Sequence, residues 1–358
     1  MAVSPPISSP HALGSNRTRS IMLQVLLATL PGVLLLTWFF GWGTLINILL
    51  AGSFAIAIEA AILRLRQRPV AFYLNDGSAL VTAWLLALAL PPYAPWWLVL
   101  VASGFAMVFG KHLYGGLGQN PFNPAMLGYA MVLVSFPVEM TSWPVWRGIE
   151  QLQPALTPTL GLIDGLQRVF APASLPTDGW TSATALDLLK NNSALTLDEL
   201  RAAQPAFGSM AGRAWEWISL AWLAGGLFLL YRRVYSWHAP VGMLAALALM
   251  SLLFWNGSGS ASNGSPLFHL LGGATMLGAF FIVTDPVSGA TSARGRLVFG
   301  AGVGILVYVI RVWGNYPDAV AFAVLLMNLC APTIDYYTTP RTYGHSKPKR
   351  GLGKVDQP

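Results

Sequence analysis

Long apolar runs recur along the whole chain, and they restrict its fold more than any other feature. A run of about 17–25 residues is the length that an α-helix needs to cross roughly 30 Å of hydrocarbon. Only 10% of the 358 residues are charged, whereas a soluble domain has about 25%. We therefore predict an all-α polytopic membrane protein. About ten transmembrane helices are expected, near residues 21–40, 44–63, 77–90, 96–112, 123–137, 214–231, 239–255, 267–284, 296–312 and 317–334.

Basic residues orient these predicted helices. If the N-terminus is cytoplasmic, Arg17, Arg64, Lys111 and the basic C-terminal tail all lie on the cytoplasmic side, as the positive-inside rule requires. Arg311 is an exception near the outer face, and so are the basic residues of a polar stretch at 138–212; long polar stretches cross largely regardless of charge. Membrane topology thus accounts for the net charge of +7, and we expect no binding of nucleic acid.

Two segments of the chain resemble each other. In "GSALVTAWLLALALPP" and "GGATMLGAFFIVTDP" a proline follows the first glycine at the same distance: Gly77 with Pro91, and Gly272 with Pro286. Further on, "GQNP" at 118–121 corresponds to "GNYP" at 314–317. The alternative is chance, because Gly and Pro are common in membrane helices.

A true repeat would contain five helices in each half, and an odd number inverts the second half relative to the first. Inverted repeats carry their binding sites at the repeat interface, often on broken helices. The expected organisation is a cytoplasmic tail (1–20), a first five-helix repeat (21–137), an extracytoplasmic insert (138–212), a second five-helix repeat (213–335) and a basic cytoplasmic tail (336–358).

Between the fourth and fifth predicted helices lies the string "KHLYGGLGQNPFNPAMLGYA" at 111–130. Its glycines permit left-handed backbone, its prolines lack an N–H, and Asn120 and Asn123 offer donors and acceptors. Non-helical backbone persists at membrane depth only where it faces protein or a water-filled cavity. The string predicts a broken helix that faces a ligand or ion site, or an interfacial turn.

Ionisable groups within the predicted helices are few. The acidic residues near membrane depth are Glu59, Asp76, Asp285, Asp318 and Asp335. A buried one is a candidate for a transport role; Glu59 is the best placed, with pairing to an arginine such as Arg64 as the alternative. With one cysteine and five scattered histidines, we expect no metal site, and we see no set of catalytic side chains.

Two short polar strings have the same form: "DGWTSAT" at 178–184 and "DPVSGAT" at 285–291. By themselves both indicate turns. In "SATALDLLK" a hydroxyl residue precedes an apolar run, which is typical of a helix N-cap. Topology separates the two strings, because 178–184 falls outside and 285–291 falls inside.

Together with "KHLYGGLGQNPFNPAMLGY", "TDPVSGATSARGRLVFG", "YPDAVAFAVLLMN" and "IDYYTTPRTYGH", these strings carry a family resemblance over about 20–345. The chain resembles the RnfD family, which supplies a membrane subunit of the Rnf-type ion-translocating electron transport complex. That family is related to a membrane subunit of the sodium-translocating NADH:quinone reductase.

The resemblance implies a covalent FMN, joined through its phosphate to a threonine hydroxyl by a flavin transferase outside the cytoplasm. The acceptor would be Thr184, in a motif context of Asp178, Gly179, Thr181, Ser182 and Ala183. Ser182 stands where the family often has Gly. Thr291 is the rival acceptor, but Pro286 replaces the motif Gly and an enzyme outside the cytoplasm would not reach it.

The same resemblance implies a second, non-covalent flavin, riboflavin, within the membrane part, for which Asn120 and Asn123 are one possible place. It also implies a bacterial inner membrane, partner subunits designated A, B, C, E and G, and electron transfer between ferredoxin and NAD coupled to Na⁺ or H⁺ translocation. A secondary transporter or channel without a redox cofactor is the alternative, since inverted repeats suit it equally well.

Overall fold

The computed structural model describes residues 18–149, 160–172, 179–192, 194–260, 262–316 and 318–340. Most of the two predicted tails and parts of the predicted insert therefore lie outside the described residues. Within them the fold is helical, and the only β-pairing consists of two isolated bridges. The helices of the first half are α1 (Thr18–Phe40), α2 (Gly43–Leu65), α3 (Val70–Leu74), α4 (Ser78–Ala89), α5 (Trp96–Phe105), the π-helix η1 (Ala106–His112), α6 (Pro124–Ser135) and α7 (Pro137–Thr141).

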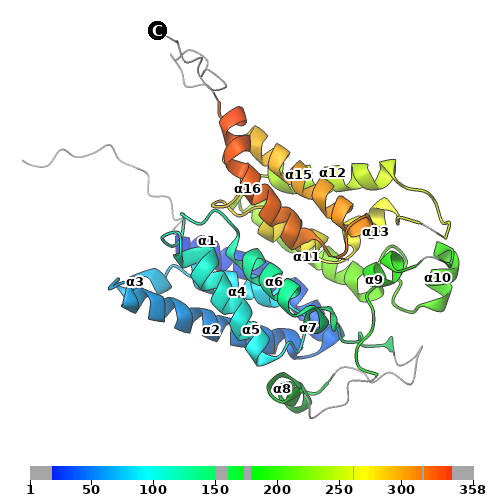
Figure 1. The fold of residues 1–358 in the computed structure, drawn as a ribbon, viewed down its shortest axis with the longest axis horizontal. Helices are drawn as coiled ribbons and strands as arrows, with labels where there is room; N and C mark the ends of the chain where they lie inside the picture. Colours follow the sequence, from blue (N-terminus) through cyan, green and yellow to red (C-terminus); the bar gives the residue numbers. More distant parts are fainter. Residues whose placement is uncertain are drawn as a thin grey trace, which may run out of the picture.

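The middle of the chain and the second half contain α8 (Leu162–Phe170), α9 (Ala185–Lys190), α10 (Leu197–Ala203), α11 (Arg213–Tyr231), α12 (His238–Leu253), α13 (Pro266–Leu271), α14 (Thr275–Leu277), the π-helix η4 (Gly278–Ile282), α15 (Ala293–Val312) and α16 (Val320–Thr338). Figure 1 shows α8, α9 and α10 near the end of α7, away from α3 and the C-terminal end of α16.

Five of these helices are long and apolar enough to cross a membrane: α1, α2, α11, α15 and α16. Shorter apolar helices occupy the third, fourth, fifth and seventh predicted ranges. The architecture is that of a polytopic α-helical membrane protein, as predicted. The count of ten spans and the inverted relation of the two halves stay predictions.

The eighth predicted helix, 267–284, is interrupted. α13 ends at Leu271 with Gly272 as its C-cap, Gly273 adopts a φ of 59°, and α14 begins at Thr275. A left-handed φ is costly for residues with a Cβ and is open to glycine. The N–H of Ala274, which has no helical partner there, donates to Asp318 Oδ2 at 2.8 Å. The glycine pair thus breaks the helix, and a carboxylate satisfies the exposed backbone.

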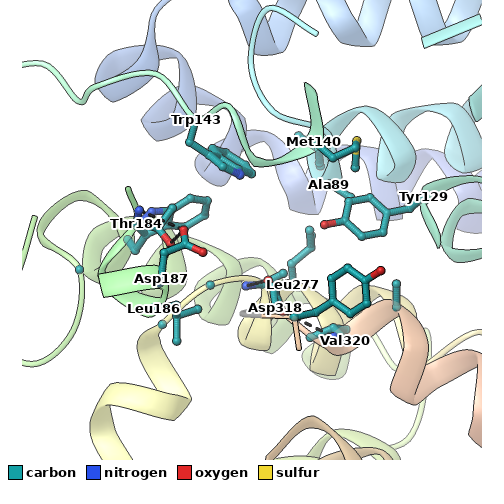
Figure 2. A pocket seen from close by; sticks show the side chains of 18 of the residues that line it. Ala89, Tyr129, Met140, Trp143, Thr184, Leu186, Asp187, Leu277, Asp318 and Val320 are labelled. Carbon is teal, nitrogen blue, oxygen red and sulfur yellow. Dashed lines mark hydrogen bonds between the residues drawn. The ribbon is translucent and has the colours of Figure 1, made fainter. Parts of the chain in front are cut away.

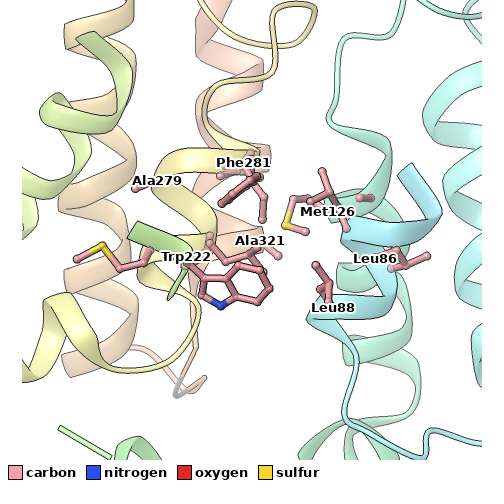
Figure 3. Close-up of a cluster of buried hydrophobic side chains, with 14 of the residues drawn as sticks. Leu86, Leu88, Met126, Trp222, Ala279, Phe281 and Ala321 are labelled. Carbon is pink, nitrogen blue, oxygen red and sulfur yellow. The ribbon is translucent and has the colours of Figure 1, made fainter. Parts of the chain in front are cut away.

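Small residues bring the helices of the two halves close together. A Cβ on Gly32 of α1 would lie 2.2 Å from Trp222 of α11, and one on Gly225 would lie 2.0 Å from the carbonyl oxygen of Ala28. Such small-residue contacts drive helix association where lipid removes the hydrophobic difference. A large apolar core results: Leu88 and Met126 face Trp222, Phe281 and Ala321 across the boundary between the halves (Figure 3).

Candidate functional site

Thr184 is the N-cap of α9, as the sequence predicted. Its Oγ1 accepts a hydrogen bond from the N–H of Asp187 at 3.3 Å, and Asp187 Oδ2 accepts from the N–H of Thr184 at 3.1 Å. This is a complete capping box. The hydroxyl of Thr184 also donates to the same carboxylate oxygen at 2.5 Å. The Thr184 side chain is only partly buried, so its hydroxyl is within reach of another molecule.

The residues that precede Thr184 form a short loop against the segment after α7. Asp178 lies outside the described residues, and Gly179 has a φ of 81°. Thr181 pairs with Pro144 in an isolated antiparallel bridge, and the N–H of Ser182 donates to the carbonyl of Trp143 at 3.1 Å. Ala183 is exposed. Main-chain hydrogen bonds to the segment after α7 therefore fix the loop just before Thr184.

Thr184 lies on the wall of a cavity between the two halves, which we call the Thr184 cavity (Figure 2). It contains about 1150 Å³ of empty space, part of it open to solvent. Its lining is largely apolar and aromatic, with two carboxylates at Asp187 and Asp318. The aromatic residues come from α6, from the segment after α7, from α11 and α13, and from the loop before α16: Tyr129, Trp143, Trp215, Trp222, Phe268 and Tyr316. An apolar cavity with a few polar groups is typical of a cofactor site.

Lys190, the last residue of α9, joins this helix to the second half. Its Nζ donates to the carbonyl oxygens of Ile310, Arg311 and Tyr316 at 3.3, 3.1 and 3.0 Å. The last carbonyls of a helix lack intrahelical partners, so the ammonium caps the C-terminal end of α15. The position of Thr184 at the cavity thus depends on this contact six residues along the chain.

The side chain of Arg311, whose carbonyl accepts one of these hydrogen bonds, is buried. Its guanidinium donates to the carbonyl of His269 at 2.9 Å and to that of Gly272 at 3.3 Å, and it pairs with Asp318 Oδ1 at 3.3 Å. The exception to the positive-inside pattern is therefore a paired, buried cation that stabilises the break between α13 and α14.

A second cavity also has lining residues from both halves, and we call it the Asn123 cavity. It contains about 1300 Å³ of empty space, part of it open to solvent, and the irregular backbone before α6 forms part of its wall. Asn123 is the N-cap of α6: its Oδ1 accepts from the N–H of Met126 at 3.2 Å, and its Nδ2 approaches Asp285 Oδ2 at 3.4 Å. Asn120 is buried in the wall and donates to the carbonyl of Phe122 at 2.9 Å.

The rival string at 285–291 has a different environment. Asp285 accepts from the hydroxyl of Ser288 at 2.7 Å and from the N–H of Val287 at 3.0 Å, and it faces the Asn123 cavity. Thr291 is exposed, and its N–H donates to Asp335 at 2.8 Å. Thr291 does not line either of the two cavities.

Glu59 is buried, as predicted, but its partner is not an arginine. Lys111 Nζ pairs with Glu59 Oε1 at 2.5 Å and donates to Ser78 Oγ at 2.7 Å, while His112 Nε2 lies 3.2 Å from the same Glu59 oxygen. The expected pairing with Arg64 is wrong, because Lys111 lies on η1, which packs against α2. The Asp76 side chain caps α4 through the N–H of Ser78 at 2.7 Å.

Comparison with known proteins agrees with the resemblance seen in the sequence. The model of the NQR2, RnfD, RnfE family matches residues 6–344. The chain belongs to this family. It is 72% identical over 348 residues to the subunit designated D of an ion-translocating oxidoreductase complex of Ectopseudomonas mendocina, covering 97% of this chain and 98% of the relative. The protein of the same description from Pseudomonas aeruginosa is 66% identical, covering 98% and 99%, and that from Vibrio vulnificus 53%, covering 94% and 98%.

The family match spans Thr184 and both cavities. Several residues of the Thr184 cavity were not found from the sequence. Asp187 was within reach, because Thr-x-x-Asp is a capping-box pattern. Tyr129, Trp215 and Asp318 come from helices and loops distant in sequence, and only the packing of the two halves brings them to the insert.

Proposed function

We propose that this chain is the RnfD-type membrane subunit of an ion-translocating oxidoreductase complex in a bacterial inner membrane. Relatives that match nearly its whole length are described as subunits of such a complex. In this proposal the complex passes electrons between ferredoxin and NAD pools through several subunits and moves Na⁺ or H⁺. This chain would supply binding sites and orientation for flavin, and its partners would be the other subunits and a flavin transferase.

The observation that carries the proposal is the position of Thr184, a partly buried residue, on the wall of an aromatic cavity. FMN would be held through a phosphoester to this hydroxyl, and when bound it would supply one- and two-electron redox chemistry. The residues fit the group: Trp143, Trp215 and Tyr129 offer aromatic faces and edges to a flat ring. The apolar wall would limit the access of water to it.

The chain's own residues would act on the acceptor before and after attachment. The bridge between Pro144 and Thr181 presents the loop to a transferase, with Asp178, Gly179, Ser182 and Ala183 as recognition context. Asp187 holds the Thr184 hydroxyl in one orientation. Attachment removes the hydroxyl proton, so the hydrogen bond to Asp187 must then be replaced.

The Asn123 cavity is our proposed location for a second, non-covalent flavin such as riboflavin. Asn120 and Asn123 are buried in its wall, and their amide groups lie in the same cavity as Asp285. A coupling ion is the alternative occupant, since carboxylate and amide oxygens are ligands for hard cations.

Three matched features support two inverted five-helix repeats and, with them, ten spans. Gly77 has a φ of 77°, and Gly273, one residue after the Gly272 that matches Gly77 in the repeat, has a φ of 59°; each precedes a half-helix. Asp76 and Asp318 each accept from an N–H at the start of that half-helix. Lys111 and Arg311 are buried at the end of the fourth helix of each half. Lys111 donates to Ser78 at the start of α4, and Arg311 donates to Gly272 before α14. The first helices, α1 and α11, pack together, as do the fifth, α6 and α16.

The test is flavin fluorescence of the chain on a denaturing gel after co-expression with an active flavin transferase. We expect wild type and Thr291→Ala to fluoresce and Thr184→Ala to be dark. Thr196→Ala is the matched control, because Thr196 caps α10 with the same capping box in the same insert; it should fluoresce.

Loss of fluorescence only in Thr291→Ala would reverse the proposed orientation of the chain. A dark wild type beside an active transferase would favour a secondary transporter without a redox cofactor.

A further inference from the structure

Helix α8 exposes apolar side chains that the described part of the chain leaves uncovered. Ile163 is 79% exposed, Phe170 53%, Leu162 47% and Leu166 39%. At 100° per residue these four positions occupy one arc of roughly 100° on the helix surface. Water-facing helices of soluble regions carry polar residues on such an arc, so this face is unusual for an insert outside the membrane.

The side of α8 that packs on the protein is a different one. Gly165 lies so close to Tyr93 that a Cβ would be 2.6 Å from the ring, and Val169 is fully buried with Tyr93, Ile46 and Trp180. This contact is specific, because only a residue without a side chain fits at Gly165. The orientation of α8 is therefore fixed by its buried side, and its apolar arc is held outward.

The polar residues of α8 complete the pattern. Arg168 stacks its guanidinium 4.3 Å from the centre of the Trp180 ring, and Asp164 is exposed on the side away from the apolar arc. The helix thus has three sides: one against the protein, one polar and one apolar. Amphipathic helices that lie in a membrane interface have such a separate apolar side.

The neighbourhood of α8 identifies what covers the apolar side. α8 packs against α2 near the start of that helix, where Ile46 is buried beneath it. α2 is long and apolar enough to cross a membrane, and one turn from Ile46 its Leu49 is 71% exposed. Figure 1 shows α8 at the edge of the bundle, beside the ends of α2 and α5.

We propose that α8 lies in the lipid interface of the outer leaflet, with Leu162, Ile163, Leu166 and Phe170 inserted among the headgroups and the first acyl carbons. The occupant is the bilayer, and neither a soluble partner nor water is needed to cover this face. The proposal stands whether or not Thr184 carries a flavin.

The position of α8 in the lipid interface would also restrict the loop before Thr184. Trp180, four residues before Thr184, is clamped between Arg168 of α8 and Tyr93, whose ring meets it edge-on at 5.9 Å. A lipid-anchored α8 would thereby hold the loop before Thr184 at the height of the membrane surface, and the insert would not rise freely into the aqueous phase.

The test uses Cys330, the single cysteine of the chain, replaced by Ser as a background. Ile163→Cys and Asp164→Cys are made separately in the full chain, labelled with a polarity-sensitive fluorophore and reconstituted in liposomes. We expect lipids with a nitroxide near the headgroup to quench the label at position 163, and aqueous iodide to quench the label at 164. Adjacent positions on one helix control for the depth and folding of the whole insert.

A second measurement in native membranes uses the whole complex. An impermeant maleimide polymer that shifts the mass of this chain on a gel should modify Asp164→Cys and leave Ile163→Cys largely unmodified, both in the complex and in the isolated chain. Iodide quenching at both positions alike would overturn the proposal in favour of water. Modification of Ile163→Cys in the isolated chain, with protection only in the complex, would overturn it in favour of a partner subunit.

Discussion

Replacement of Lys190 by methionine should release α9, and with it Thr184, from the second half of the chain. The ammonium makes two hydrogen bonds to main-chain carbonyls in the last turn of α15 and a third to that of Tyr316 in the loop before α16. Methionine keeps most of the apolar stem and removes the donor. The rest of the fold does not depend on this side chain, so we expect local opening and not global unfolding.

The size of the effect follows from the contacts. A hydrogen bond from a charged group contributes about 1.5–3 kcal/mol, and a cation at a helix C-terminus about 0.3–1 kcal/mol. The three bonds share one donor and do not add. Burial lowers the pKa of Lys190, so desolvation offsets part of the gain. A net loss of about 2 kcal/mol corresponds to a roughly thirtyfold increase in the open fraction.

Hydrogen exchange measures that fraction. The N–H groups of Leu188 and Asn191 donate to the carbonyls of Thr184 and Asp187 at 2.9 and 3.0 Å, so their exchange reports the opening of α9. We expect it to accelerate about thirtyfold in Lys190→Met. Arg201→Met is the control, because it removes a positive charge from α10, and Arg201 Nε makes no hydrogen bond within the described residues. Unchanged exchange in Lys190→Met, or equal acceleration in the control, would refute the proposed anchor.

Three further predictions concern packing, buried charge and pH. A Cβ on Gly304 would lie 2.2 Å from a backbone oxygen of α12, so Gly304→Ala should cost about 3 kcal/mol and lower the thermal midpoint in detergent, while Gly259→Ala, where nothing lies within 4 Å, should not. Lys111→Met should destabilise the chain by about 3–5 kcal/mol because Glu59 is left buried and unpaired, and adding Glu59→Leu should recover most of that loss in the same assay. Hydrogen bonds from the backbone N–H and hydroxyl of its capping partner hold the pKa of Glu199 below 4.5. The capping box of α10 is therefore fully stabilising above pH 4.5 and is lost as pH falls through the lowered pKa of Glu199. Hydrogen exchange of the Leu200 amide, which donates to the carbonyl of Thr196, would report this loss. Protection of that amide that persists unchanged after Glu199 is protonated would contradict the prediction.

The long apolar helices were predictable because bilayer thickness dictates their length. The starts and ends of α1, α2 and α11 fall within a few residues of the predicted ranges. The N-cap at Thr184 was also predictable, because a capping box is a local pattern.

The interruption at Gly272 and Gly273 was not predicted, although both glycines were noted as part of a repeat. Its decisive element is the carboxylate of Asp318, which comes from 44 residues further along the chain. Sequence separation hid the partner of Glu59 for the same reason, because Lys111 lies 52 residues further along the chain. Hydrophobic periodicity says which residues avoid water, but the choice of a buried ion's partner depends on how helices pack.

The anchor at Lys190 also sets an order of events during synthesis. Its three carbonyl partners lie 120, 121 and 126 residues later in the chain. At about 5–20 residues per second, the ribosome needs roughly 6–25 seconds to make them after Lys190 itself. Through that interval the loop before Thr184 has left the ribosome and its docking surface does not yet exist. Under the proposed function, a flavin transferase would meet Thr184 first on this undocked segment, and α9 would dock only when α15 has been made.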